Sequence, residues 1–288
     1  MIDPIQFVQT AIDYRALHLD PVIVEIGPIA LRWYSLAYIG GIMLAWWYIL
    51  RLIRKPGAPM SAAHIDSFVT YITLGIILGG RIGYVLFYDF AEYAKHPLNA
   101  LKLWEGGMSF HGALVGVLVA IALFVRANKL SFLRFCDYVA VTIPFGLCFG
   151  RIANFINGEL WGSPTTLPWG VIFPEGGPLP RHPSQLYEAG LEGPVLFAIL
   201  WWLFHKTEAR YYPGRIAGAF ALFYGLFRFL VEFIREPDSQ LTGFAAATGL
   251  HMGQWLSLPL ILVGLYFMLT SKGRRRRVEP IAGTASQA

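Results

Sequence analysis

The chain has 288 residues, of which 56% are hydrophobic and 14% are charged, and its mean hydropathy is +0.51. An ordinary water-soluble domain carries about 25% charged residues, so this composition excludes that class and indicates an integral membrane protein. The formal net charge is +5, and the basic run Arg274–Arg277 contributes most of it. Such a run after an apolar segment is typical of a topology anchor at anionic lipid headgroups. We expect no nucleic-acid partner.

Apolar stretches long enough to cross a membrane recur along the chain. A bilayer core of ~30 Å requires roughly 17–25 mostly apolar residues in a helix, and seven stretches qualify. The predicted spans are Ile29–Leu50, Ser67–Tyr88, Met108–Val125, Asp137–Ile156, Tyr187–Phe204, Ile216–Phe233 and Gly253–Thr270. The fifth is the weakest, because Glu188, Glu192 and Pro194 crowd its start. The predicted fold is an all-α polytopic membrane protein with seven transmembrane helices.

Basic residues fall mainly on one side of these spans. The loops after the first, third and fifth spans, together with the tail, hold 14 of the 23 lysines and arginines. Because such residues accumulate in cytoplasmic loops, we predict an external, periplasmic N-terminus and a cytoplasmic C-terminus. Residues 1–271 would form a single membrane domain and 272–288 a basic cytoplasmic tail. The external segment 1–28 and the Gly- and Pro-rich external loop 157–186 would form a small cap, without a cleavable signal peptide.

No motif in the sequence requires a metal or a cofactor. Cys136 and Cys148 lie twelve positions apart on one predicted helix, about 18 Å at ~1.5 Å per residue, which is too far for a disulfide. The sequence contains no HExxH motif, P-loop or dinucleotide fingerprint. We therefore predict neither a metal site nor a cofactor.

Three arginines within the predicted spans share one depth. Arg81, Arg151 and Arg228 lie seven, five and five residues before the outer ends of spans two, four and six, or ~8–10 Å deep. Hydrocarbon penalises such groups unless they are paired or functional. Further polar residues at or near the same boundary are Tyr34, His111, Asn154, Asn157, Glu159 and Glu232.

Two stretches carry most of this polarity. The run Gly150–Gly162 closes span four with an arginine, two amides and a glutamate. In span six, polar residues recur at i, i+4, i+8 and i+11, which places them on one helix face. They are Tyr224, Arg228, Glu232 and Arg235. A self-satisfied Arg228–Glu232 pair that only locks helices together would explain this stripe equally well.

The shared depth favours a site for an anion. Arginine binds phosphate bidentately, and at headgroup depth the simplest phosphate is that of a phospholipid. If that phosphate leaves, arginines stabilise its growing charge and a general base activates the nucleophile. His111, Glu159 and Glu232 are candidates for the base, and spacing does not choose among them.

Two other classes of protein remain alternatives at this point. A transporter or flippase for an anionic lipid or solute also carries arginines within its spans, but it would place basic residues at successive depths. A structural scaffold would use Arg151 for stability alone, so that Arg151→Ala would lower abundance instead of giving a folded, inactive protein.

The run Gly150–Gly162 resembles the signature of bacterial prolipoprotein diacylglyceryl transferases. Four further blocks follow in family order: Ile26-Gly27-Pro28 before Arg32-Trp33-Tyr34, Met108–Gly112, His182–Glu188, and Arg228 through Glu232 to Arg235–Asp238. Ala153 departs from the glycine that is common in the family, although a small residue is kept. The resemblance covers nearly the whole chain.

The resemblance implies a multi-pass enzyme of the bacterial inner membrane. It would move the diacylglyceryl group of phosphatidylglycerol onto the lipobox cysteine thiol of a preprolipoprotein, forming a thioether and releasing glycerol phosphate. By similarity, Arg151 and Arg228 hold the phosphate and His111 is the proposed base; nearby arginines favour the thiolate of a thiol with pKa ~8.5. Residues that would shape the site by similarity are Asn154, Glu159, Gly162, Tyr34, Tyr224, Glu232 and Arg235. Arg81 joins the substrate-binding set through its depth.

Overall fold

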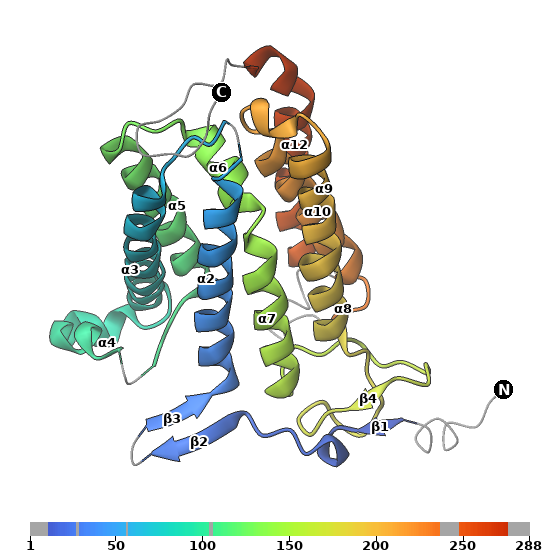
Figure 1. Ribbon diagram of the computed structural model, residues 1–288. Helices are drawn as coiled ribbons and strands as arrows, with labels where there is room; N and C mark the ends of the chain where they lie inside the picture. Colours follow the sequence, from blue (N-terminus) through green and yellow to red (C-terminus); the bar gives the residue numbers. More distant parts are fainter. Residues whose placement is uncertain (1–10, 27–28, 56, 104–105, 237–247, 276–288) are drawn as a thin grey trace. The chain divides into compact units, whose positions relative to one another are not determined.

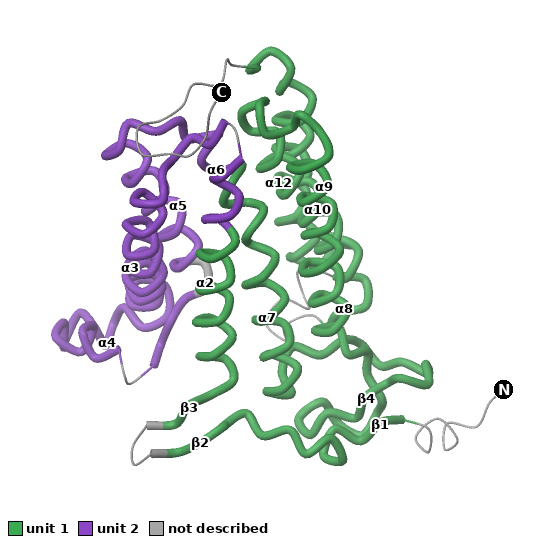
Figure 2. Tube along the Cα trace, in the orientation of Figure 1, with its two compact units in different colours: residues 1–48, 137–276 green, residues 49–136, 277–288 purple. Residues whose placement is uncertain are grey.

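The computed structural model describes residues 11–26, 29–55, 57–103, 106–236 and 248–275 (Figure 1). Three stretches used above, Gly27-Pro28, Pro237-Asp238 and the basic tail from residue 276, lie outside the described residues. The chain divides into two compact units (Figure 2). The first comprises residues 1–48 and 137–276, and the second comprises residues 49–136 and 277–288.

Short strands open the first unit. β1 (Ile12–Asp13) pairs in parallel with β4 (Val171–Ile172), and β2 (Val22–Ile26) pairs antiparallel with β3 (Ile29–Arg32). Because β4 belongs to the long loop after the fourth predicted span, its pairing joins the N-terminal segment to that loop. The two parts of the predicted cap are therefore packed together. Which side of the membrane they face stays a prediction.

Tyr14, in the 3-10 turn η1 (Tyr14–Leu17), anchors this segment to the end of α7 (Ile143–Ile156). Its hydroxyl donates to the backbone carbonyl of Ile156. Its ring centroid lies 5.5 Å from that of Phe173, and both rings are buried beside Val171. Burial raises the pKa of the Tyr14 hydroxyl.

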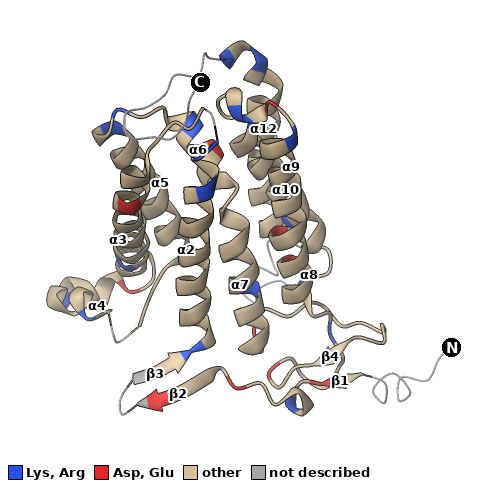
Figure 3. Ribbon diagram, viewed as in Figure 1, with Lys and Arg blue, Asp and Glu red and all other residues tan. Residues whose placement is uncertain are grey.

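Helices make up most of the remaining described residues of the first unit. They are the start of α2 (Trp33–Leu52), the end of α6 (Phe132–Ala140), α7, α8 (Ser184–Gly190), η4 (Leu191–Val195), α9 (Leu196–Lys206), η5 (Ala209–Tyr211), α10 (Arg215–Val231), α12 (Met252–Thr270) and η7 (Ser271–Arg274). Between Arg32 and Arg51, α2 carries no charged residue (Figure 3). This apolar surface is what a lipid-facing helix requires.

The fifth predicted span is a single helix interrupted by a π-helical turn. α8, η4 and α9 run continuously over Ser184–Lys206, with Pro194 inside the π-helical turn. Proline lacks the N–H that an α-helical turn uses, and a π turn accommodates this local disruption. Glu188 in α8 and Glu192 in the π turn are both buried.

Asp137 supplies the N-terminal cap of α10. Gly214, which precedes this helix, has φ of 82° and no side chain with which to cap it. The Asp137 carboxylate accepts hydrogen bonds from the backbone N–H groups of Gly214, Ile216 and Ala217 at 2.7, 2.9 and 2.8 Å. It thereby satisfies donors that the first turn of a helix leaves without partners.

The second unit is built around two glycine-rich helices, α3 (Ala62–Phe87) and α5 (Phe110–Ala127), with α4 (Phe90–Lys95) and η2 (Pro97–Leu101) between them in sequence. A Cβ on Gly79 would lie 2.5 Å from the carbonyl oxygen of Gly112, and one on Gly83 would lie 2.6 Å from its Cα. Only glycine allows so close an approach. Gly112 and Gly116, four residues apart on α5, thus form a packing groove for α3.

Among the residues that the structure describes, four helices are long and apolar enough to cross a membrane: Trp33–Leu52, Ala62–Phe87, Ser184–Lys206 and Met252–Arg274. The pair Phe132–Ala140 and Ile143–Ile156, bent by 44°, makes a fifth if it is one span. The cysteines predicted on one helix thus lie on either side of this bend. α5 and α10 are helical where spans were predicted, but neither is among these helices. The count of seven spans stays a prediction.

Candidate active site

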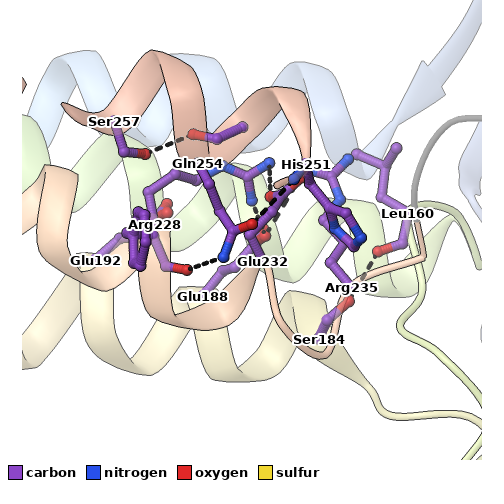
Figure 4. A network of polar contacts seen from close by, with 12 residues as sticks. Leu160, Ser184, Glu188, Glu192, Arg228, Glu232, Arg235, His251, Gln254 and Ser257 are labelled. Atoms are coloured by element: carbon purple, nitrogen blue, oxygen red, sulfur yellow. Dashed lines mark hydrogen bonds and ion pairs between the residues drawn. The ribbon is translucent and has the colours of Figure 1, made fainter. Parts of the chain in front are cut away.

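Glu188 is the centre of a buried ion-pair network (Figure 4). Its Oε1 lies 2.6 Å from Nη1 of Arg228, and its Oε2 lies 2.8 Å from Nε of Arg151. Nη1 of Arg235 is 3.9 Å from Oε1. The Glu188 side chain is 1% exposed, whereas those of the three arginines are 13–18% exposed. One carboxylate therefore contacts guanidinium groups from α7, from α10 and from the segment after α10.

Two more carboxylates complete the network. Arg151 Nε donates to Oε2 of Glu192 at 3.2 Å, and Nη2 of Arg228 lies 2.7 Å from Oε2 of Glu232. Three arginines thus face three glutamates, and their formal charges cancel. This neutral network differs from the cationic site that the arginines had predicted, because Glu188 and Glu192 were not among the predicted site residues. Their i, i+4 spacing at the apolar helix start was the signal of a shared polar face.

The end of the signature run packs against Arg235. α10 ends at Val231, so Arg235 does not share one continuous helix face with Arg228, as the periodicity had predicted. It forms an isolated antiparallel bridge with Gly162, and burial, together with repulsion from Arg228, lowers its pKa. A Cβ on Gly162 would lie 2.5 Å from the carbonyl oxygen of Ile234. The signature glycine is therefore required by the close approach of two backbones.

Glu159 is held by the two amides of the same run. Its Oε1 accepts hydrogen bonds from Nδ2 of Asn154 at 2.8 Å and from Nδ2 of Asn157 at 3.1 Å. Its backbone carbonyl accepts from Nε2 of Gln185 at 2.5 Å. Gln185 lies on α8, the helix that carries Glu188. The turn after α7 is thus fixed to the helix at the centre of the ion-pair network.

The two tyrosines of the predicted site have different surroundings. Tyr224, one turn before Arg228 on α10, interacts electrostatically with Arg151 and Glu192. The Tyr34 ring lies 5.2 Å from that of Tyr38. Tyr224 therefore belongs to the network, while a role of Tyr34 in substrate binding stays a prediction.

Arg81 and His111 belong to the second compact unit. Arg81 is 4% exposed, and its five N–H donors face backbone carbonyls of the connection between α3 and α5. The acceptors are the carbonyls of Asn99, Ala100, Lys102, Gly106 and Gly107. Arg81 thus organises this connection, and its binding of substrate stays a prediction. His111 lies in the first turn of α5, and its side chain is outside the described residues.

Comparison with known proteins connects this site to one family. The family model for prolipoprotein diacylglyceryl transferase matches residues 21–270. The phosphatidylglycerol–prolipoprotein diacylglyceryl transferase of Zymomonas mobilis is 50% identical over 280 residues, which cover 94% of this chain and 97% of the relative.

Two further relatives carry the same name. That of Rhodospirillum rubrum is 54% identical over 266 residues, or 92% of this chain and 95% of the relative. That of Nitratidesulfovibrio vulgaris is 53% identical over 255 residues, or 88% and 95%. The resemblance carried by the signature run and its companion blocks is thereby confirmed, and the chain belongs to the prolipoprotein diacylglyceryl transferase family.

Proposed function

We propose that this protein transfers the diacylglyceryl group of phosphatidylglycerol to the lipobox cysteine thiol of a preprolipoprotein, the first step of lipoprotein maturation. The names of the relatives supply the lipid and the class of protein substrate. The structural observation that carries the proposal is the buried network in which Arg151 and Arg228 share the carboxylate of Glu188.

The reaction replaces one bond with another at a single glycerol carbon. The cysteine sulfur attacks the carbon that is esterified to the phosphate, a C–S bond forms, and the C–O bond to the phosphate breaks. The thiol proton passes to a base, and glycerol phosphate leaves with the bonding electrons. Because negative charge grows on the leaving phosphate, Arg151 and Arg228 lower the barrier when both donate to its oxygens.

The glutamates prepare the arginines for this role. A buried guanidinium without a counter-charge is costly, so Glu188, Glu192 and Glu232 hold the arginines in place before the lipid arrives. The phosphate then takes over N–H groups that now face these carboxylates. Binding is therefore an exchange of one anion for another at groups already in position.

We assign the base to His111. Glu159 already accepts hydrogen bonds from Asn154 and Asn157, and Glu232 is paired with Arg228, so both carboxylates are engaged. The family resemblance gives the histidine this role. Asn154, Glu159, Gly162 and Tyr224 then maintain the shape of the site.

The same proposal places the enzyme in the bacterial inner membrane with seven spans, an external N-terminus and cap, and a cytoplasmic C-terminus. The apolar helices and the pairing of β1 with β4 support it. Cysteine residues introduced one at a time into the cap and the basic loops, and labelled from outside intact cells, test the sidedness.

The activity is tested with purified protein, phosphatidylglycerol and a lipobox peptide, by following peptide mass and glycerol phosphate release. We expect the wild type to add one diacylglyceryl group. We expect Arg151→Ala to abolish the addition and His111→Gln to lower it, with both proteins folded. Arg54→Ala, at an exposed arginine, is the matched control and should stay active. A folded wild type that moves lipid between leaflets but adds no mass would overturn the proposal in favour of transport.

A further inference from the structure

The Glu232 carboxylate is pressed against a glycine of another helix. Gly253 is the second residue of α12, and Glu232 directly follows α10. A Cβ built on Gly253 would lie 2.6 Å from Cδ, 2.6 Å from Oε2 and 2.7 Å from Oε1 of Glu232. No real Cβ tolerates such distances, so the absence of a side chain at residue 253 creates the space that the carboxylate occupies.

The atoms that an added Cβ on Gly253 would meet belong to the flexible end of the Glu232 side chain. At Gly264, farther along α12, an added Cβ would instead lie 2.6 Å from the backbone oxygen of Gly218, which could yield only if α10 and α12 separated. At Gly253 the helices can stay where they are while the Glu232 carboxylate moves. A methyl group there would therefore change the position of one catalytic-site carboxylate and leave the fold in place.

The start of α12 packs against this carboxylate and is itself held in place by hydrogen bonds. The backbone N–H of His251 donates to Oε1 of Gln254 at 2.9 Å. Nε2 of Gln254 donates to the backbone carbonyl of Phe229 on α10 at 3.5 Å. Figure 4 shows Gln254 and His251 together with Glu232 and Arg228. The positive end of the α12 dipole also favours a carboxylate at this place. Glu232 is thus held between the first turn of α12 on one side and Arg228 on the other.

We propose that Gly253 is a positioning residue for diacylglyceryl transfer. It keeps the Glu232 carboxylate in contact with Arg228, and Glu232 in turn orients the Arg228 guanidinium toward the lipid phosphate. The inference rests on the proposed function, because the consequence of the contact is measured on the transfer reaction. In this role Gly253 acts through Glu232 and needs no contact of its own with the lipid or the peptide.

A purely structural role for Gly253 predicts a different result. Alanine is a better helix former than glycine, so a helix that merely needed a small residue here would accept Gly253→Ala with unchanged or higher stability and unchanged kinetics. The positioning role predicts unchanged stability with a slower reaction. Misplacing a catalytic group by about 1 Å can cost ~100-fold, and we expect Gly253→Ala to lower kcat by ~10- to 100-fold. The KM for phosphatidylglycerol should change by less than about threefold, because Arg151 still binds the phosphate.

A second substitution tests whether Gly253 acts through Glu232. Glu232→Asp shortens the side chain by one methylene and withdraws the carboxylate from the space that the alanine methyl would fill. We expect the combined variant Gly253→Ala/Glu232→Asp to be more active than the product of the two single losses predicts. Independent, multiplying effects would overturn the inference, because the two residues would then not be coupled.

The controls separate this inference from the proposed function. Gly273→Ala, where an added Cβ would meet nothing within 4 Å, should match the wild type in activity and melting temperature. Gly264→Ala should lower the melting temperature. The positioning role, but not the proposed function, would be contradicted by either of two results. Gly253→Ala could keep kcat within twofold of wild type, or its melting temperature could fall as much as that of Gly264→Ala. A folded wild type without transferase activity would contradict the proposed function itself.

Discussion

Oε2 of Glu188 lies 2.8 Å from Nε of Arg151, although the long Gly- and Pro-rich loop separates the two residues in sequence. The same carboxylate contacts Arg228 through its other oxygen. The arginine that the signature run supplies is therefore positioned by a residue outside that run.

Replacing the Glu188 charge tests whether this carboxylate prepares both arginines. Glu188→Gln keeps the size of the side chain but leaves three arginines facing two carboxylates. We expect transfer to fall by ~100-fold, because the guanidinium groups lose their common anchor. Loss of one partner of a buried ion pair costs up to ~3–5 kcal/mol, and the retained amide oxygen should keep the loss of unfolding free energy below this.

An exposed ion pair supplies the control for Glu188. Glu208 lies 3.3 Å from Arg275, with side chains 63% and 58% exposed. Surface pairs contribute about 0–1 kcal/mol, so Glu208→Gln should leave both activity and stability close to wild type. Equal behaviour of the two glutamine variants in melting and lipidation assays would show that Glu188 does not position the arginines.

The cap that Asp137 provides to α10 predicts a loss of stability without a direct effect on chemistry. Asp137→Ala leaves the N–H groups of Gly214, Ile216 and Ala217 without the acceptor they now share. We expect the unfolding free energy to fall by at least ~2 kcal/mol, the upper end for loss of an N-terminal cap, with Asp137→Asn intermediate. Asp89→Ala is the matched control, because Asp89 precedes α4 without a side-chain cap bond. Equal melting temperatures for the two alanine variants would contradict this account.

The anchor between Tyr14 and α7 predicts a pH dependence on the alkaline side. Burial raises the Tyr14 pKa above its ordinary value of 10.0, so the folded protein favours the neutral hydroxyl. This contribution is complete below pH ~10 and is lost as the pH rises through the folded pKa. Tyr14→Phe removes the hydrogen bond to Ile156 but keeps the ring, and should cost about 1 kcal/mol. It should also flatten the alkaline decline in melting temperature; a decline as steep as that of wild type would rule out Tyr14 as its source.

His182 predicts the opposite dependence, on the acidic side. Desolvation lowers its pKa from the ordinary 6.5, so the folded protein favours the neutral imidazole. The resulting stability is present above pH ~6.5 and is lost as the pH falls through the lowered folded pKa. His182→Gln should therefore reduce the fall in melting temperature between pH 7 and pH 5. His96→Gln, at a side chain that is 64% exposed, should retain the wild-type slope, and an unchanged slope in both variants would contradict the assignment.

The sequence was most informative where one chemical requirement dominated. The convergence of Arg151 with Arg228 and the family itself were both predicted from residues that have few alternative uses. Periodicity was less reliable at helix ends: the spacing from Tyr224 to Arg235 suggested one helix face, but the backbone leaves the helix after Val231.

The charge balance of the site could not be predicted from the arginines alone. Glu188 and Glu192 weakened the hydropathy signal of the fifth span, and a hydropathy pattern records the cost of a charge without its partner. Gly253 carried no signal either, because its role depends on the position of the Glu232 carboxylate just after α10. Such contacts form between segments that no local sequence pattern connects, so the sequence does not reveal them.

The order of the six network charges along the chain has a consequence for membrane insertion during synthesis. Arg151 is made first, followed by Glu188, Glu192, Arg228, Glu232 and Arg235. Summed in that order, the network never carries more than one unit of charge of either sign. The network itself is therefore neutral or one charge from neutral whenever a further helix enters the membrane, and the cost of uncompensated ions in hydrocarbon does not accumulate within it during synthesis.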